Sequence, residues 1–272
     1  MHRSASRSLL VAILLAWTLP GAATAGPAQP AITPASSPQP APFDPFNKSS
    51  NLQVLPETTT PAELRDTMRG FALGLGVRCN HCHVGENPAD LRTFDFAADD
   101  KAEKRSAREM LKMVRRINRE VLPGIRRPDP ADRLEVACMT CHRGLPRPEL
   151  IQDVLRRERR TGGAEAAIAR YRELRARYYG SHSYDFSEAP LIGEARDWGR
   201  GSDASDGLAL AEFAAELFPN SAQPLAVQAE LLAAQGRRQE AIDAAERAAG
   251  IDPQSPIVQH LLRTLSAPEP AK

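Results

Sequence analysis

Two pentapeptides share one pattern, in which two residues separate a pair of cysteines and a histidine follows at once. They read CNHCH at residues 79–83 and CMTCH at residues 138–142, and together they hold all four cysteines of the chain. On a helical turn the two sulfurs lie on one face, and the next imidazole projects from the same side. This spacing is the attachment signature of c-type haem. We therefore predict two covalently bound haem c groups, attached through Cys79, Cys82, Cys138 and Cys141.

The alternatives for these cysteines are two disulfides or a zinc site. Disulfides are the usual reading in an oxidising compartment, but neither alternative explains a histidine placed directly after each pair. A structural zinc site also needs closed tetrahedral ligation. We expect His83 and His142 to bind one axial position of each iron. Opposite axial ligands are usually Met or His, and the candidates within the mature chain are Met68, Met110, Met113, His182 and His260.

The first candidate ligand lies on a well-marked helix. Thr60, Pro61 and Glu63 form a capping box with proline at the first helical position. Met68 then shares one apolar face with Leu64, Phe71 and Leu75 at helical spacing. Glycines follow before the first pentapeptide, so the methionine can fold back over a haem bound just downstream. The alternative is an ordinary core methionine.

A second helix is predicted from about residue 101 to residue 120, with Asp99 or Asp100 as its cap. Its apolar stripe carries Met110 and Met113. One of the two can bind the second iron while the other packs, and periodicity does not choose between them.

The segments NLQVLP, MRGFALGLGVRCNHCH, AREMLKMVRRIN and VACMTCHRGLPRP, in this order over residues 51–148, resemble the photosynthetic reaction-centre cytochrome c subunit family. This resemblance implies a multihaem module in which a Met-bearing helix turns into each Cys-x-x-Cys-His. It implies Met68 as ligand of the first haem and Met110, rather than Met113, as ligand of the second. Four-haem members have two such halves, and this chain has one. The family histidine that serves a haem of the other half has no counterpart in residues 120–128, as expected of a two-haem protein.

The N-terminus has the layout of a secretory signal peptide. Basic residues precede an apolar run at 9–19, and Ala23-Thr24-Ala25 resembles a cleavage site. The run is shorter than the about 20 residues that span a bilayer. We expect cleavage after Ala25 and export to the periplasm, with association at the inner membrane; the alternative is an uncleaved anchor. A Pro-rich linker over 26–45 follows.

Beyond residue 148 the chain becomes rich in Ala, Arg and Glu, and a repeat emerges. FPN at 218–220 and DPQ at 252–254 are related by the tetratricopeptide period of about 34 residues. Small residues recur in step, Ala195 with Ala229 and Ala214 with Ala248. We predict two helical pairs over 187–253 and a capping helix at 255–265; the alternative is a generic helical hairpin. An amphipathic helix over 162–180 precedes them, and no haem ligand is expected after residue 148.

The sequence thus predicts an all-α protein: signal peptide 1–25, linker 26–45, dihaem cytochrome c domain 46–148, helical connector 149–186 and tetratricopeptide-like repeats 187–266. The formal charge of +1 gives no indication of nucleic acid binding. Basic runs at 104–127 and 156–160 are either solvated helix faces or surfaces that steer an acidic redox partner. We expect an electron carrier whose repeats dock redox partner proteins, including membrane-bound ones such as a reaction centre or respiratory complex. The alternatives are a dihaem enzyme of peroxidase type and a scaffold with structural haems.

Overall fold

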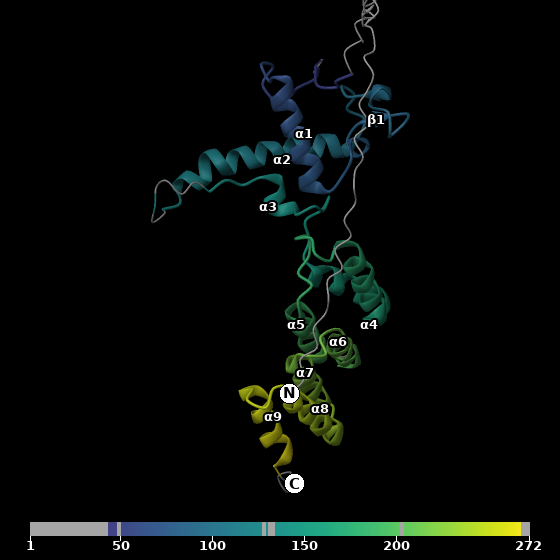
Figure 1. The fold of residues 1–272 in the computed structure, drawn as a ribbon, viewed down its shortest axis with the longest axis vertical. Coiled ribbons are helices and arrows are strands. Elements are labelled where there is room, and N and C mark those ends of the chain that lie inside the picture. Colours follow the sequence, from purple (N-terminus) through teal and green to yellow (C-terminus); the bar gives the residue numbers. More distant parts are fainter. Residues whose placement is uncertain (1–42, 48–49, 127–128, 130–133, 202–203, 268–272) are drawn as a thin grey trace, which may run out of the picture. The chain divides into compact units, whose positions relative to one another are not determined.

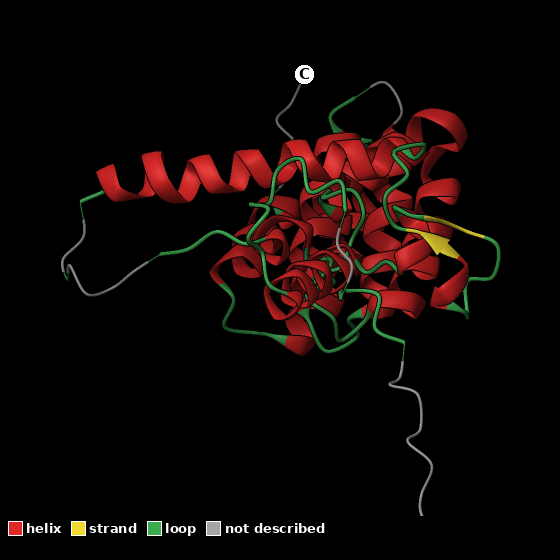
Figure 2. Cartoon of the chain, turned by 90° about the horizontal axis from the view of Figure 1, so that it is seen from above, coloured by secondary structure: helices red, strands yellow, loops and turns green. Residues whose placement is uncertain are grey.

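The computed structural model describes residues 43–47, 50–126, 129, 134–201 and 204–267. The predicted signal peptide and most of the predicted linker therefore lie outside the described residues. The predicted all-α class is confirmed (Figure 2): helices dominate, and one short antiparallel pair joins β1 (Val84–Gly85) to β2 (Phe94–Asp95). Within the described part of the chain, no helix combines the length and apolar character that crossing a membrane requires.

The helix expected to carry the first methionine is α1, Pro61–Leu75. Its predicted capping box is present, because the Glu63 amide donates to Thr60 Oγ1 at 3.3 Å and the Thr60 amide donates to Glu63 Oε2 at 2.8 Å. The helix ends at Gly76, whose φ of 66° is the left-handed conformation favoured by glycine. This end directs the chain into the 3-10 turn η1 (Cys79–His81), the strand pair and a second 3-10 turn, η2 (Leu91–Thr93).

The second predicted helix is present over nearly its expected length, but its last turn is not α-helical. It is α2, Ala102–Arg116, and it continues as a π-helical turn, η3 (Ile117–Val121), and a 3-10 turn, η4 (Leu122–Gly124). The predicted aspartate cap is wrong, because the N-cap is Lys101 and no side chain caps the helix. Asp99 instead pairs with Lys104 at 3.1 Å and with Arg108 at 2.8 Å, so its charge acts from beside the helix.

The second pentapeptide forms the short helix α3, Cys138–His142, which packs against the end of α1. Gly74 of α1 is buried there, and a Cβ added to it would lie 2.7 Å from Cys138 Cβ. The Gly144 amide donates to the Gly74 carbonyl at 2.9 Å. Glycine at position 74 thus lets the two elements meet at backbone distance.

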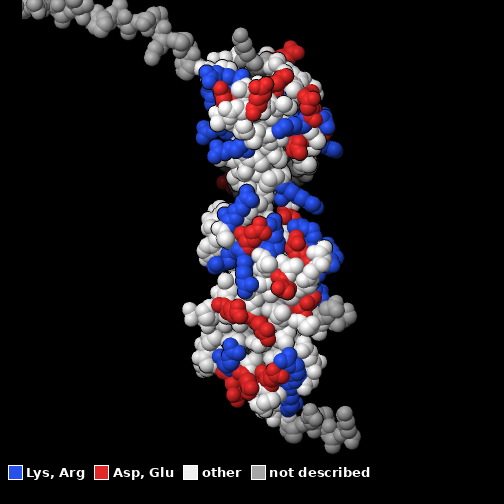
Figure 3. Space-filling view, turned by 90° about the vertical axis from the view of Figure 1, so that its right-hand side faces the viewer, with Lys and Arg blue, Asp and Glu red and all other residues white. Residues whose placement is uncertain are grey.

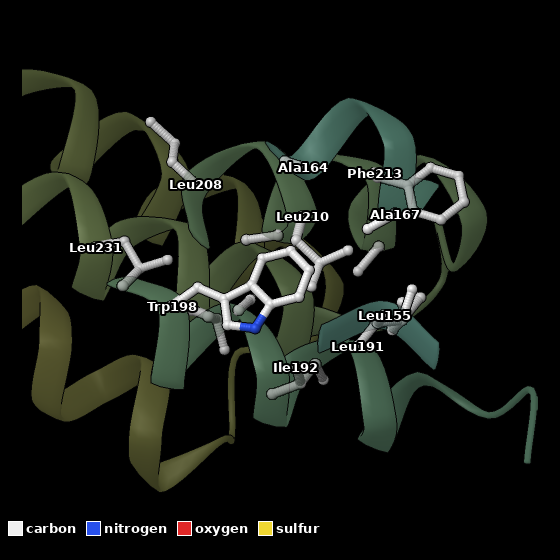
Figure 4. Close-up of a cluster of buried hydrophobic side chains, with 14 of the residues drawn as sticks. Leu155, Ala164, Ala167, Leu191, Ile192, Trp198, Leu208, Leu210, Phe213 and Leu231 are labelled. Atoms are coloured by element: carbon white, nitrogen blue, oxygen red, sulfur yellow. The ribbon is translucent and has the colours of Figure 1, made fainter. Parts of the chain in front are cut away.

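In the described residues, the C-terminal region consists of six helices, coloured from green to yellow in Figure 1. They are α4 (Ile151–Tyr178), α5 (Glu188–Gly199), α6 (Ala204–Leu217), α7 (Ala222–Ala234), α8 (Arg238–Ile251) and α9 (Pro256–Ser266). α4 lies within the predicted helical connector, and a break at Gly162 and Gly163 separates its first part from the predicted amphipathic helix. Buried side chains form a continuous cluster from α4 to α9. Figure 4 shows Trp198 within it, beside side chains of neighbouring helices.

The loop just before residue 148, where the division of the chain was expected, packs with the C-terminal helices. Leu145, only 4% exposed, belongs to the same buried cluster as Ile151 and Val154 of α4. Ser183, in the loop after α4, donates from Oγ to the Arg143 carbonyl at 2.8 Å. The C-terminal core therefore includes the loop directly after the second pentapeptide.

Candidate functional site

A cavity of about 1200 Å³, which includes its mouth open to solvent, lies between α1, α2 and the first pentapeptide. Met68 lines it from α1, and Cys79, Cys82 and His83 line it from the pentapeptide. The structure thus brings together all four residues that the sequence assigned to the first site. Most of the remaining lining is apolar, including Leu52, Val54, Leu55, Leu64, Phe71, Val77, Leu91, Phe96 and Leu111.

His83 is held as a neutral imidazole. Its pKa is lowered to about 4, chiefly by burial and next by the charge of the nearby Lys104. A metal ligand must be the unprotonated imidazole, so this environment favours ligation at neutral pH. The ring meets Phe96 edge to face, with centroids 5.0 Å apart. Its Nδ1 atom is buried and has no hydrogen-bond partner among the described residues.

Part of the basic run on α2 points into the protein rather than into solvent. Lys104, 9% exposed, donates to the carbonyls of Phe96, Ala97 and Ala98 at 2.9, 3.0 and 2.7 Å. Arg115 donates to the Val54 carbonyl at 2.7 Å. These hydrogen bonds hold residues 96–98 and Val54 beside the cavity. Lys104 is therefore not part of a solvated helix face.

Around Asp99 the same helix forms a small charged network. Asp99 Oδ2 accepts hydrogen bonds from Asn51 and Gln53 at 3.0 and 2.9 Å. The Arg108 guanidinium, the largest influence, holds the pKa of Asp99 well below its usual range. Arg108 also donates to the Asn51 carbonyl at 3.2 Å. The network fixes the start of the segment 51–54, which forms one wall of the cavity.

At the second pentapeptide the histidine is oriented by the backbone that follows it. His142 Nδ1 lies 2.8 Å from the Leu145 carbonyl oxygen. A carbonyl accepts only, so Nδ1 carries the proton, and in the neutral ring the lone pair is then on Nε2. Metal-ligating histidines commonly make this contact, because it fixes the tautomer and raises the basicity of the other nitrogen.

Met110 and Met113, the two candidate ligands of the second haem, have exposed side chains. Met110 and Met113 of α2 are 46% and 45% exposed, so exposure does not distinguish them. Val121, Ile125 and Leu134 are also exposed, by at least half of their surface.

Sequence reasoning missed the residue that joins the two parts of the second site. Asn118, in the π-helical turn after α2, donates from Nδ2 to the Val136 carbonyl at 2.8 Å. Its Oδ1 accepts from the Val136 amide, also at 2.8 Å. This double contact ties α2, which carries Met110, to the segment that leads into Cys138. Asparagine at the end of the stripe was the available signal, since few side chains can both donate to and accept from one backbone residue.

Ion pairs within the C-terminal region involve most of the second basic run. Arg156 binds Glu194 through two contacts of 2.9 and 2.6 Å, and Arg159 binds Asp206 at 2.8 Å. Arg157 pairs with Glu149 at 2.9 Å. Arg156 and Arg159 thus join α4 to α5 and α6, and Arg157 binds the segment that leads into α4. Acidic and basic side chains are intermixed over the face drawn in Figure 3, and neither sign forms a single large patch there.

The donor sets suit covalent haem at both pentapeptides. Each has two thiols that are free of disulfides, and a histidine held in the unprotonated or correctly tautomeric form. The clusters of acidic residues, cysteines or histidines that other metal sites use are absent from the described residues. Two of the expected ligands, Met68 and His83, line one cavity.

The sequence was also compared with known proteins. The profile of the family described as photosynthetic reaction centre cytochrome C subunit matches residues 27–191. This match covers more than half of the chain and extends through α4 into α5. The comparison with curated proteins gave no match. Membership in this family indicates a protein that carries haem and transfers electrons. The chain belongs to the photosynthetic reaction centre cytochrome c subunit family.

Proposed function

We propose that this protein is an exported dihaem c-type cytochrome that carries electrons between protein partners. One observation carries the proposal: Met68 lines the same apolar cavity as Cys79, Cys82 and His83. A thioether and an imidazole contributed by different elements to one cavity are the axial ligand pair of many electron-transfer haems. When bound, each haem would supply an iron that cycles between its ferric and ferrous forms.

The residues of this chain would hold the two groups as follows. Cys79 and Cys82 would form thioether bonds to the first haem, with His83 and Met68 as axial ligands. For the second haem the axial ligands would be His142, oriented through its Nδ1 contact, and Met110. Met110 is chosen over Met113 by the family resemblance of the AREM segment, since the two methionines are equally exposed. The thioether bonds of the second haem would come from Cys138 and Cys141.

Electron transfer is favoured over peroxidase-type chemistry by the lining of the first cavity. An enzyme of that type needs a weak or open distal position and a placed acid or base. Among the residues that line this cavity, the single histidine is His83, on the attachment side, and a methionine comes from α1. Two of the three cationic residues in the lining, Lys104 and Arg108, are engaged with carbonyls or with Asp99, and the third, Arg78, directly precedes the first pentapeptide.

The helices after α4 would act as a tetratricopeptide-like docking platform. The helices α5, α7 and α9 begin at residues 188, 222 and 256, and α6 and α8 begin at 204 and 238. Both series advance by the tetratricopeptide period of about 34 residues. The small residues that recur at this period, Ala195, Ala229, Ala214 and Ala248, are all 0% exposed. Such packing supports stacked helical pairs, which generally present a surface to other proteins.

The place of action would be the periplasm, because the N-terminus has signal-peptide character. Its partners would be redox proteins, including membrane-bound complexes such as a reaction centre or a respiratory complex.

The decisive experiment measures haem number and ligation in the purified mature protein. We expect a mass increment of two covalent haems that survives acid extraction. Met68→Ala should remove about half of the charge-transfer absorption that marks methionine bound to ferric iron. Met110→Ala should remove the other half, and Met113→Ala is the matched control that should leave it unchanged. One haem per chain, bound zinc, or rapid turnover of peroxide by the intact protein would contradict the proposal. If the haems exchange no electrons with any redox partner protein tested, the result would favour a scaffold with structural haems.

A further inference from the structure

The loop that follows the second pentapeptide connects the candidate haem ligand to the C-terminal helices. We propose that the C-terminal helical region positions His142 through Leu145, so that the redox equilibrium of the second haem depends on the packing of this region. This inference rests on the proposed role of His142 as an axial ligand. Leu145 and Ser183 would act as positioning residues, since neither is expected to touch the iron.

The first step is the hydrogen bond itself. The Leu145 carbonyl accepts from His142 Nδ1 at 2.8 Å, over only three residues. A hydrogen bond at this nitrogen increases electron donation from the opposite one. A more basic ligand stabilises ferric over ferrous iron, so the strength of this contact influences the midpoint potential.

The second step is what fixes the carbonyl. The Leu145 side chain is 4% exposed and belongs to the cluster that also contains Ile151, Val154 and Tyr184. The carbonyl and the side chain share one Cα atom, so a shift of Leu145 in that cluster moves the acceptor as well. The C-terminal core therefore sets the position of the group that orients His142.

The third step is the constraint on the rest of the loop. Arg143 and Gly144 both have left-handed backbone conformations, with φ of 50° and 84°. The Arg143 carbonyl accepts from Ser183 Oγ at 2.8 Å, and Ser183 is itself 2% exposed. The Gly144 amide donates to the Gly74 carbonyl of α1. The loop is held from the C-terminal region on one side and from α1 on the other, so it has little freedom to compensate for a shift of Leu145.

The first site provides an internal comparison. His83 Nδ1 has no hydrogen-bond partner among the described residues. The Leu145 carbonyl accepts from the histidine of the second site, His142. A change in the C-terminal core should therefore reach the second haem and leave the first one nearly unaffected.

The test uses three variants of the full-length protein with both haems attached. Leu145→Ala removes the buried anchor, and Ser183→Ala removes one hydroxyl at almost constant volume. Leu225→Ala is the matched control, because Leu225 is 5% exposed but lies in a separate buried cluster with Ala226 and Val258. Midpoint potentials of both haems are measured by potentiometric titration. Met110→Ala serves to assign the signals of the second haem.

We expect Leu145→Ala to shift the second haem toward its ferrous form by roughly threefold, well below the 10–100-fold effect that removal of such a partner has on metal sites. This factor corresponds to about 28 mV, at about 59 mV per tenfold for one electron. Ser183→Ala should shift it in the same direction by a smaller factor. The first haem, and both haems of Leu225→Ala, should keep the potentials of the unaltered protein.

Several outcomes would overturn the inference. They are equal shifts at both haems in Leu145→Ala, a shift in Leu225→Ala as large as in Leu145→Ala, and no shift in both Leu145→Ala and Ser183→Ala. If Leu145→Ala does not assemble, the Ser183→Ala result decides alone. Failure of the proposed function would look different: His142→Ala would then keep the same low-spin spectrum and haem content, whatever the potentials of the other variants.

Discussion

Two glycines of α1 should respond to alanine with opposite signs. Gly70 lies in the helix with no atom within 4 Å of the position that a Cβ would take. One turn later, a Cβ on Gly74 would lie 2.7 Å from Cys138 Cβ and 3.1 Å from the Met139 amide nitrogen. The same chemical change is therefore made on one helix, once in open space and once in the contact between α1 and α3.

The magnitudes follow from two opposing effects. Alanine in a helix interior is more favourable than glycine by about 1 kcal/mol. Gly70→Ala should gain about this amount in the free energy of unfolding. Gly74→Ala gains the same helix propensity but overpacks the contact with Cys138, which costs about 1–3 kcal/mol. The added methyl group would meet the Cβ of Cys138 and backbone atoms, and a side-chain rotation cannot move any of these atoms away. Gly74→Ala should therefore be about 1–3 kcal/mol less stable than Gly70→Ala.

The assay is denaturant unfolding of the holoprotein under identical conditions, followed by circular dichroism and by the haem absorption. Displacement of α3 in Gly74→Ala should also disturb the haem attached through Cys138 before the one attached through Cys79. If Gly74→Ala is as stabilising as Gly70→Ala, with both haem spectra unchanged, the close approach of α1 and α3 is refuted.

Three further perturbations test other parts of the structure. Asn118→Ala should lower the free energy of unfolding by about 1–3 kcal/mol, because both backbone polar groups of Val136 lose their partner. Mass spectrometry should also show incomplete haem attachment at the second pentapeptide. Complete attachment with unaltered stability would contradict the role of the Asn118–Val136 contact. Burial raises the pKa of Tyr171 to about 12. The unfolded chain loses this proton from about pH 10 while the native state keeps it, so stability should fall from about pH 10 to about pH 12, and urea unfolding should show a shallower fall in Tyr171→Phe. Glu194→Ala should lower the free energy of unfolding by about 1–3 kcal/mol, because the buried Trp198 Nε1 and Arg156 both lose their contacts to this carboxylate; a thermal midpoint equal to that of the unaltered protein would show that these contacts contribute nothing.

Local features of this protein could be predicted from the sequence because they depend on neighbouring residues. The capping box at Thr60 and Glu63 satisfies helix-end amides within four residues. Cys-x-x-Cys-His fixes its own geometry through one helical turn, and the all-α class follows from apolar periodicity. The sequence also placed Met68 on the stripe that lines the first cavity.

Other features were decided by contacts between residues distant in the chain. Lys104 and Arg115 lie in the same basic run as neighbours that are exposed. Only the tertiary structure shows that they donate hydrogen bonds to backbone carbonyls of residues 96–98 and of Val54. The π-helical turn that places Asn118 opposite Val136 has no local periodic signal, since it depends on a partner 18 residues away. Leu145 lies within the segment that resembles the cytochrome family, and its composition gives no sign that its side chain belongs to the C-terminal core. Tertiary packing makes that assignment because burying an apolar side chain lowers the free energy wherever the core forms, and here it forms across the boundary that composition predicted.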